Sequence, residues 1–444
     1  MKILFLTENF PPESNAAATR VYERAVYWAR WGHQVTVITT APNFPEGKLF
    51  DGYKNKWRQS ETMDGINVVR VKTYMAANKG VAQRTLDFLS FMATGFLAGI
   101  TQPRPDVVAA TSPQFFAAVA GWAIGAVRRV PFVFELGDLW PASIAAVGVL
   151  KKSFALSLIE KLELFLYRQS AAIAALTGSF KEDLVSRGIR GDKIAVVING
   201  VDLSRYGPRE RDAKLSDDYG LAGKFVVGYV GTHGMAHALG NVLDTAELLK
   251  NAEEESGRDD IRFLLAGAGA ERDALMADAA ARGLDNVIFM ARQPKEKMPA
   301  VWSLCNVALV HLKESPVFAG VIPSKIFEAQ AMGLAILLAA PTGEASKIIA
   351  ADRAGLHVAA EDPKALLAAV LDLYTDGNKR SALAKNSLAA APGHSRETQA
   401  REMLAVLEMA AAGNGDAAHT INADTHAGAP RLYGGADQIP EEKA

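Results

Sequence analysis

Short apolar runs rich in β-branched residues alternate with helical patterns along most of this chain. Runs of this kind are typical of buried strands, and their alternation with helices favours an α/β fold with mainly parallel sheets. In the first half the predicted strands cover residues 2–7, 34–40, 68–72, 106–111, 132–136, 171–176 and 194–198. In the second half they cover residues 225–230, 262–266, 287–290, 307–312, 335–339 and 356–358.

A polar, irregular stretch separates the two series of strands and indicates two doubly wound domains in tandem. We expect a first domain over residues 1–203, a linker over 204–221 and a second domain over 222–394. A last helical pattern at 395–411 has no strand after it and is predicted to pack back across the first domain. Residues 413–444 are mainly Gly, Ala, Asp, Thr and His, so this tail is predicted to be disordered.

Composition and charge agree with a globular protein that has substantial cores. The chain has 444 residues, of which 49% are hydrophobic, and its formal net charge is −1. A charge so close to zero gives no electrostatic basis for a nucleic-acid partner. The single cysteine, Cys305, excludes an intramolecular disulfide framework and a multi-cysteine metal site, and its apolar neighbours predict a core position. Glu8 interrupts the apolar N-terminus too early for a signal peptide, so we expect a cytoplasmic protein.

Two helical stretches in the first half are candidates for contact with a membrane surface. Residues 88–100 carry no charge but are too short to span a bilayer. Residues 150–168 repeat apolar side chains at helical spacing, with lysine and arginine among them. Packing into the core is the alternative for each stretch. Their common location predicts that any peripheral contact with the inner face of a membrane is made by the first domain.

Residues 323–333 carry the strongest indication of chemistry. Pro323 favours a helix start, where Ser324 can cap the helix and the free N–H groups can bind an anion. Lys325 adds a mobile positive charge at the same end. Glu328 lies one turn further on, where it can accept hydrogen bonds from hydroxyl groups such as those of a ribose. An anion site beside a hydroxyl acceptor suits a nucleoside diphosphate, although an ordinary amphipathic helix fits the same residues.

Glycine-rich turns follow two predicted strands of the second domain. Ligands of open α/β sheets bind beyond the carboxyl ends of the strands, so residues there are the first candidates. The first turn is Gly231-Thr232-His233-Gly234, whose glycines permit the close backbone approach of a phosphate-binding turn. The second is Gly267-Ala268-Gly269, which lacks the third glycine of a dinucleotide fingerprint and is weak evidence for NAD.

Two loops of the first domain offer further candidates. After the first strand, two prolines and a run of small residues that includes Asn15 and Ala16 indicate a loop that enters a helix N-terminus and that a ligand approaches closely. Arg20 follows in the same segment and could meet a phosphate or an acceptor there. A plain connection between strand and helix fits the same pattern. Further on, Asp138 precedes Trp140 at the end of a predicted strand. Asp138 is a candidate catalytic or acceptor-binding carboxylate, or the cap of the next helix.

In chain order these features resemble the retaining GT-B glycosyltransferases of family 4. The resemblance spans residues 1 to about 411 and rests on Phe10-Pro11-Pro12, Asn199-Gly200-Val201-Asp202, Gly231-Thr232, Gly267-Ala268-Gly269 and the 323–333 segment. Within the family, Asp138-Leu139-Trp140-Pro141 and Pro323-Ser324-Lys325 look most like the bacterial enzymes that build cell-surface polysaccharides from nucleotide-activated amino sugars. The resemblance implies two Rossmann-like domains facing a cleft.

The resemblance also implies ligands and residue roles. The second domain would hold a UDP-sugar donor, and no cofactor would be needed besides this substrate. The acceptor would be a glycan or a polyprenyl-diphosphate-linked sugar. Glu328 would accept the ribose hydroxyls, while Lys325, Ser324 and the 231–234 turn would neutralise the diphosphate. The loop from Asn15 would close over the donor. Asp138 would face the reacting sugar or the acceptor, which makes it and Lys325 the candidate catalytic residues.

Two departures from the family pattern concern the leaving group. Gly320 stands where the family often has a first glutamate, and His233 stands in a neighbourhood where many members have arginine and lysine. Without a metal, positive charge must come from Lys325, from helix dipoles and from Arg292 or Arg20.

Several other classes of enzyme are disfavoured by missing motifs. The chain has no Asp-x-Asp, Gly-x-Ser-x-Gly, Walker A or His-Glu-x-x-His motif. These absences argue against Asp-x-Asp metal chemistry, serine hydrolysis and P-loop hydrolysis, and no metal site is predicted. A nucleotide-sugar epimerase and a non-catalytic nucleotide-sugar-binding subunit remain as alternative functions.

Overall fold

The computed structural model of the protein describes residues 1–13, 15–44, 46–75, 81–112, 115–139, 154–256 and 259–413. The chain divides into two compact units. Unit 1 comprises Met1–Asn199 and a C-terminal segment that begins at Arg396, and unit 2 comprises Gly200–Ser395. The tail predicted to be disordered lies outside the described residues from position 414 onward.

Over the described residues, unit 1 contains an eight-stranded sheet in the order β3-β4-β2-β1-β5-β6-β7-β8. All neighbouring pairs are parallel except β3 and β4. The strands are β1 (Lys2–Leu6), β2 (Gln34–Thr40), β3 (Arg58–Met63), β4 (Ile66–Val71), β5 (Val107–Thr111), β6 (Phe132–Leu136), β7 (Ala172–Ala175) and β8 (Ile194–Val196). The predicted α/β fold with mainly parallel sheets is confirmed. Strand β3 was not predicted because this edge strand has no apolar run.

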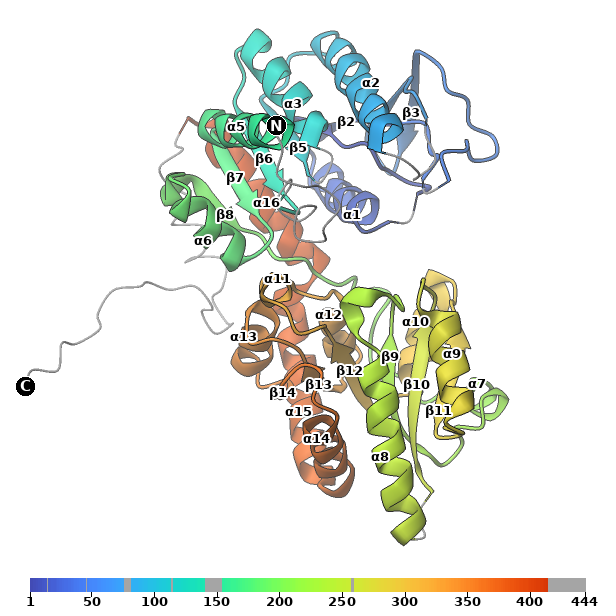
Figure 1. Ribbon diagram of the computed structural model, residues 1–444. Coiled ribbons are helices and arrows are strands. Elements are labelled where there is room, and N and C mark those ends of the chain that lie inside the picture. The colour runs from blue at the N-terminus through green and yellow to red at the C-terminus, as the bar shows by residue number, and fades with distance from the viewer. Residues whose placement is uncertain are drawn as a thin grey trace, which may run out of the picture. The chain divides into compact units, whose positions relative to one another are not determined.

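Helices cover both faces of this sheet (Figure 1). On one face the buried apolar side chains pack against α2 (Val81–Ile100), α3 (Phe115–Arg128), α5 (Phe154–Gln169) and α6 (Gly178–Ser186). On the other face they pack against α1 (Ala16–Arg30) and α16 (Arg396–Ala411). The indole N–H of Trp28 in α1 donates to the Ala400 carbonyl of α16 at 2.8 Å. The last helix therefore returns to the first domain, as predicted.

Unit 2 has a parallel six-stranded sheet in the order β11-β10-β9-β12-β13-β14. In chain order this is the 3-2-1-4-5-6 arrangement of dinucleotide-binding folds, and the direction of the connections reverses between β9 and β12. The strands are β9 (Phe225–Val230), β10 (Ile261–Gly267), β11 (Val287–Ala291), β12 (Val307–His311), β13 (Ala335–Ala339) and β14 (Gly355–Val358). Its helices are α8 (Gly240–Ser256), α9 (Arg272–Ala281), α10 (Met298–Ser303), α11 (Pro316–Ala319), α12 (Lys325–Ala331), α13 (Glu344–Ala351), α14 (Pro363–Thr375) and α15 (Gly377–Ala390).

The segment 204–221, interpreted as an irregular linker, belongs to unit 2. It contains the short helix α7 (Ala213–Asp218), which Asp212 caps. Just before it, the Arg211 guanidinium donates to three backbone carbonyl oxygens and to the Asn306 side chain. A polar stretch is thus well ordered here because its polar groups bond to the backbone, which a pattern of apolar residues does not reveal.

Candidate active site

The reversal point of unit 2 brings together several candidates of the second domain. Tyr229 belongs to β9, and its hydroxyl donates to the Thr232 carbonyl at 2.7 Å. The ammonium of Lys325, at the start of α12, lies 3.5 Å from the centre of the Tyr229 ring. Gly231 has a φ of +151°, and a Cβ there would lie 2.8 Å from Lys325 Nζ. A glycine at position 231 therefore leaves the space that the ammonium occupies.

Lys325 was predicted to carry a mobile charge, and this is wrong because its side chain is buried. It is 8% exposed, and within the described part of the chain its Nζ has no hydrogen-bond partner. Burial lowers the pKa of the ammonium to about 7, although the Glu328 carboxylate acts in the opposite direction. A buried amine with unused donors favours an anion as ligand, because the anion would supply both charge and hydrogen-bond acceptors.

The glycines after β9 and β10 bring two loops into close contact. The backbone N–H groups of Gly231 and His233 donate to carbonyl oxygens of the 266–268 segment, each at 2.9 Å. A Cβ on Gly267 would lie 1.8 Å from the Gly231 oxygen, and one on Gly269 would lie 2.1 Å from the His233 oxygen. These glycines are needed for packing of the loops. The predicted phosphate-binding turn thus has two of its backbone donors engaged within the protein.

The other two residues of this turn, Thr232 and Gly234, are less constrained. Thr232 is exposed, and its carbonyl is the acceptor for Tyr229. Gly234 has a φ of −137°, and a Cβ there would meet only Thr232, at 3.7 Å. The space beside Gly234 is therefore open, and the expectation that Gly234 allows a close backbone approach to a phosphate stays a prediction.

Three histidines surround the reversal point. His233 is fully buried, and among the described residues neither of its ring nitrogens has a hydrogen-bond partner. His311 ends β12 and lies 2.8 Å from the Asn241 amide, while His237 lies 3.3 Å from the His311 carbonyl. Burial lowers the pKa of each histidine to about 4, so all three are neutral at pH 7. No group of three metal-binding side chains occurs in the described ranges.

Arg272, at the start of α9, lies close enough to His233 for its charge to act on the imidazole. Its charge also lowers the pKa of His233, after burial. Arg292, the predicted candidate, is exposed and follows β11, which is separated from β9 by β10. Arg272, which the sequence analysis did not select, therefore acts on a residue of the reversal point, and Arg292 is not among the charges that shift the pKa of His233.

Glu328 is held by a residue that the sequence analysis did not select. The Trp302 indole N–H donates to Glu328 Oε2 at 3.0 Å. Ser324 is exposed, has helical backbone angles and makes no capping hydrogen bond with its side chain. The predicted cap is therefore wrong, because the carbonyls of Pro323 and Ser324 already accept from the first turn and the helical conformation begins at Ser324 itself.

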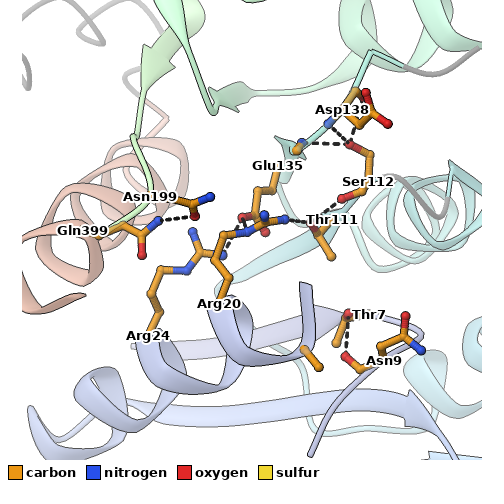
Figure 2. A network of polar contacts seen from close by, with 12 residues as sticks. Thr7, Asn9, Arg20, Arg24, Thr111, Ser112, Glu135, Asp138, Asn199 and Gln399 are labelled. Atoms are coloured by element: carbon orange, nitrogen blue, oxygen red, sulfur yellow. Dashed lines mark hydrogen bonds and ion pairs between the residues drawn. The ribbon is translucent and has the colours of Figure 1, made fainter. Parts of the chain in front are cut away.

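A second polar network lies at the carboxyl ends of β5 and β6 in unit 1 (Figure 2). Glu135 Oε1 accepts from Arg20 at 2.9 Å and from Arg24 at 2.5 Å, and Arg20 also donates to the Thr111 hydroxyl at 3.1 Å. All four side chains are buried. Burial raises the pKa of Glu135, but the two guanidinium groups reverse this and lower it. Arg20, expected to meet a phosphate or an acceptor, is thus engaged inside the domain.

Asp138 lies at the same edge, directly after β6. The Ser112 hydroxyl accepts from Gly137 N at 2.8 Å and from Asp138 N at 3.2 Å (Figure 2). Ser112 follows β5, which pairs with β1 where the connections of unit 1 reverse. The half-buried Asp138 is therefore held by its backbone near the place where α/β folds bind ligands. Trp140 and the start of the helix that Asp138 was predicted to cap lie outside the described residues.

Asn15 and Ala16 form the start of α1. The Asn15 side chain accepts from Ala18 N at 2.9 Å and caps the helix, and Ala16 is exposed in its first turn. The segment expected to be a loop that closes over the donor is therefore helical from Ala16 onward.

Comparison with known proteins decides the class. A glycosyl transferase 4-like domain model matches residues 15–200, and a glycosyl transferases group 1 model matches residues 213–389. The chain belongs to the family 4 glycosyltransferases.

Individual relatives of this glycosyltransferase are distant. WcaI of Escherichia coli, named as a colanic acid biosynthesis glycosyl transferase, is 24% identical over 75% of this chain and 82% of WcaI. A GDP-mannose-dependent alpha-mannosyltransferase of Mycobacterium tuberculosis is 25% identical over 80% of this chain and 83% of that protein. The structure of Anabaena HepE in complex with UDP has a TM-score of 0.67 at 18% identity, over 92% of this chain and 100% of HepE. The solved structure shows that the fold is GT-B.

The glycosyltransferase departs from the family pattern at Gly320. This glycine ends the short helix α11 and has no side chain with which to contact a donor. The residues that sequence reasoning missed are Tyr229, Arg272 and Trp302. A signal existed for the two aromatic residues, because a tyrosine or tryptophan in an apolar run needs a buried partner for its polar atom.

Proposed function

We propose that this glycosyltransferase transfers an N-acetylated sugar from a UDP-sugar, with retention of configuration and without a metal ion. The acceptor in this proposal is a glycan or a polyprenyl-diphosphate-linked sugar in cell-surface polysaccharide biosynthesis. The buried Lys325 ammonium at the reversal point of unit 2 carries the proposal. A nucleoside diphosphate would supply its missing counter-charge, and departure of that diphosphate is the step that positive charge accelerates.

Neighbouring groups support a nucleotide at this point. Glu328 lies one turn from Lys325 on α12 and can accept from ribose hydroxyls, while Arg272 adds positive charge beside His233. The name of WcaI supports polysaccharide biosynthesis, and the HepE complex supports UDP as the nucleotide. The name of the Mycobacterium tuberculosis relative makes GDP the competing choice.

In this proposal Asp138 of unit 1 faces the reacting sugar or the acceptor. Its position after β6, with its backbone bonded to Ser112, supports that role. Asn15, Ala16 and Trp140 stay candidate acceptor-side residues. Ser324, Thr232 and Arg292 stay candidates for outer contacts with the donor, since each follows a strand of unit 2 or begins α12.

The proposal predicts that the purified protein binds UDP more tightly than GDP in calorimetric titrations. With UDP-N-acetylhexosamine as donor, the protein should release UDP only after a polyprenyl-diphosphate-linked sugar is added. NMR of the product should show that the transferred sugar keeps the anomeric configuration it had in the donor. Isomerisation of the donor without an acceptor would favour an epimerase. Binding without turnover would favour a non-catalytic subunit. Tighter binding of GDP than of UDP would show that GDP is the nucleotide of the donor.

We also propose that unit 1 contacts anionic membranes through α2 and α5. Among the described residues no helix is long and apolar enough to cross a bilayer. Leu89 and Leu97 on α2, and Leu158 and Phe165 on α5, are large apolar side chains that are exposed. Lys161 and Arg168 are exposed on the same side of α5 as Leu158 and Phe165. Apolar side chains beside basic ones suit a surface with anionic lipids.

The combined variant Leu97→Asp/Leu158→Asp is expected to bind phosphatidylglycerol vesicles about tenfold or more weakly in co-sedimentation, because two apolar side chains no longer leave water. Met276→Asp is the matched control, since Met276 is an exposed apolar residue on α9 of unit 2. Equal vesicle binding by the two variants would contradict the assignment of this face.

A further inference from the structure

Trp302 and Glu328 form a contact between α10 and α12. Trp302 is fully buried, and its indole N–H donates to Glu328 Oε2 at 3.0 Å. Glu328 is half-buried, so part of this residue reaches the surface of the fold. The contact fixes one carboxylate oxygen.

We propose that Trp302 is a positioning residue that orients the Glu328 carboxylate toward the two ribose hydroxyls of the donor. Trp302 would thereby set the preference for ribonucleotides over deoxyribonucleotides. This inference rests on the proposed function, because it deepens the role of Glu328 in nucleotide binding.

The physical argument concerns the freedom of a glutamate side chain. Glutamate has three rotatable bonds, and its last torsion is broad, so the plane of a carboxylate without a fixed partner takes many orientations. A carboxylate accepts several hydrogen bonds, and an indole N–H is a donor only. One bond from a rigid, buried indole limits the carboxylate plane and leaves acceptor capacity for a ligand.

The charge of the donor also matters. The indole is neutral, so it orients the carboxylate without cancelling its negative charge, as an arginine or lysine in its place would do. Hydrogen bonds from hydroxyl groups to a charged acceptor are stronger than those to a neutral one. The indole therefore gives Glu328 a hydrogen bond without a counter-charge. The Glu328 carboxylate also attracts the Lys325 ammonium on the same helix and raises its pKa.

The test compares UDP with 2′,3′-dideoxy-UDP in calorimetric titrations of Trp302→Phe. The variant should bind UDP about ten- to hundredfold more weakly, the size expected for one hydrogen bond to a charged group. Its affinity for dideoxy-UDP should change less than twofold. Trp28→Phe is the matched control, because Trp28 is also fully buried and donates its indole N–H, but to the Ala400 carbonyl in unit 1. The control should leave both affinities unchanged.

A measurement that leaves Trp302 in place covers the case in which Trp302→Phe does not fold. The chain has six tryptophans. In indole-¹⁵N-labelled protein, one resonance should move in Glu328→Gln and on addition of UDP, and should stay in place with dideoxy-UDP. No such resonance, or equal loss of affinity for both nucleotides in Trp302→Phe, would overturn the role of Trp302. Wild-type protein that does not distinguish UDP from dideoxy-UDP would overturn the ribose role of Glu328 itself, while absence of UDP binding would overturn the proposed function.

Discussion

Replacing Lys325 with methionine should lower kcat/KM about 100- to 1000-fold, which is the size of effect found when one preorganised charge or donor at a developing anion is removed. Methionine fills nearly the same space above the Tyr229 ring, so the fold should persist. The loss should also appear as weaker UDP binding in calorimetry, because Lys325 would contact the diphosphate before and during the reaction.

The stability of Lys325→Met distinguishes loss of function from loss of fold. Burial lowers the pKa of Lys325 from 10.5 to about 7, so the folded state disfavours the charged form. Below pH 7 the lysine therefore destabilises the fold, and this cost fades as the pH rises toward 10.5, where the unfolded chain also loses its proton. We expect the unfolding midpoint of Lys325→Met to exceed that of the wild type at pH 6 and to approach it near pH 10.5.

The same ammonium predicts how UDP binding depends on pH. Near pH 8 most of the unliganded protein has a neutral Lys325, since its pKa is about 7. The diphosphate favours the ammonium, so binding should take up a proton, and affinity should fall by up to tenfold per pH unit above pH 7. Calorimetry in buffers of different ionisation enthalpy measures that proton uptake.

Lys364→Met, which alters an exposed lysine of unit 2, should leave kcat/KM and proton uptake unchanged. Wild-type-like activity in Lys325→Met would refute the assignment.

Glu135→Leu should destabilise unit 1 by about 3–5 kcal/mol, because it leaves two buried guanidinium groups without their shared carboxylate. Arg20 and Arg24 are each about one-twentieth exposed or less, so water does not replace the lost partner. Burial already lowers the pKa of Arg24 to about 10 with Glu135 in place, which shows how strongly this site resists uncompensated charge. Denaturant unfolding followed by far-UV circular dichroism measures the effect.

A matched control for this prediction is Glu397→Ala. Glu397 pairs with Arg401 on the exposed side of α16, and both side chains are about half exposed or more. Such surface pairs contribute about 0–1 kcal/mol. Adding Arg20→Met and Arg24→Met to Glu135→Leu should recover much of the lost stability, since a buried charged cluster can be replaced by apolar side chains. Failure of that recovery would show that the network has a further role.

The sequence predicted the sheets well because burial on both faces leaves a continuous apolar run in each central strand. Strand β3 shows the limit, since an edge strand exposed to water needs no apolar pattern. Cys305 was expected in the core, and it is buried. The single cysteine stands beside Gly228, where a Cβ would lie 2.1 Å from its sulfur.

The site was only partly predictable, because residue type does not specify a partner. Arg20 was selected for its charge, but its partner Glu135 is 115 positions away and comes into reach only when the sheet forms. A glutamate inside the apolar strand β6 was an available signal, since a buried carboxylate needs compensation. Lys325 was identified as the important cation, whereas its burial against Tyr229 depends on how α12 meets β9.

The return of α16 to unit 1 has a consequence for synthesis on the ribosome. Unit 2 is one continuous stretch, residues 200–395, whereas unit 1 needs residues from both ends of the chain. Until α16 has emerged, the face of the unit 1 sheet that receives Met403, Val406 and Leu407 is uncovered, together with Trp28. The domain that is translated first is therefore the one completed last, and the nascent N-terminal half must remain soluble while the whole nucleotide-binding half is being made.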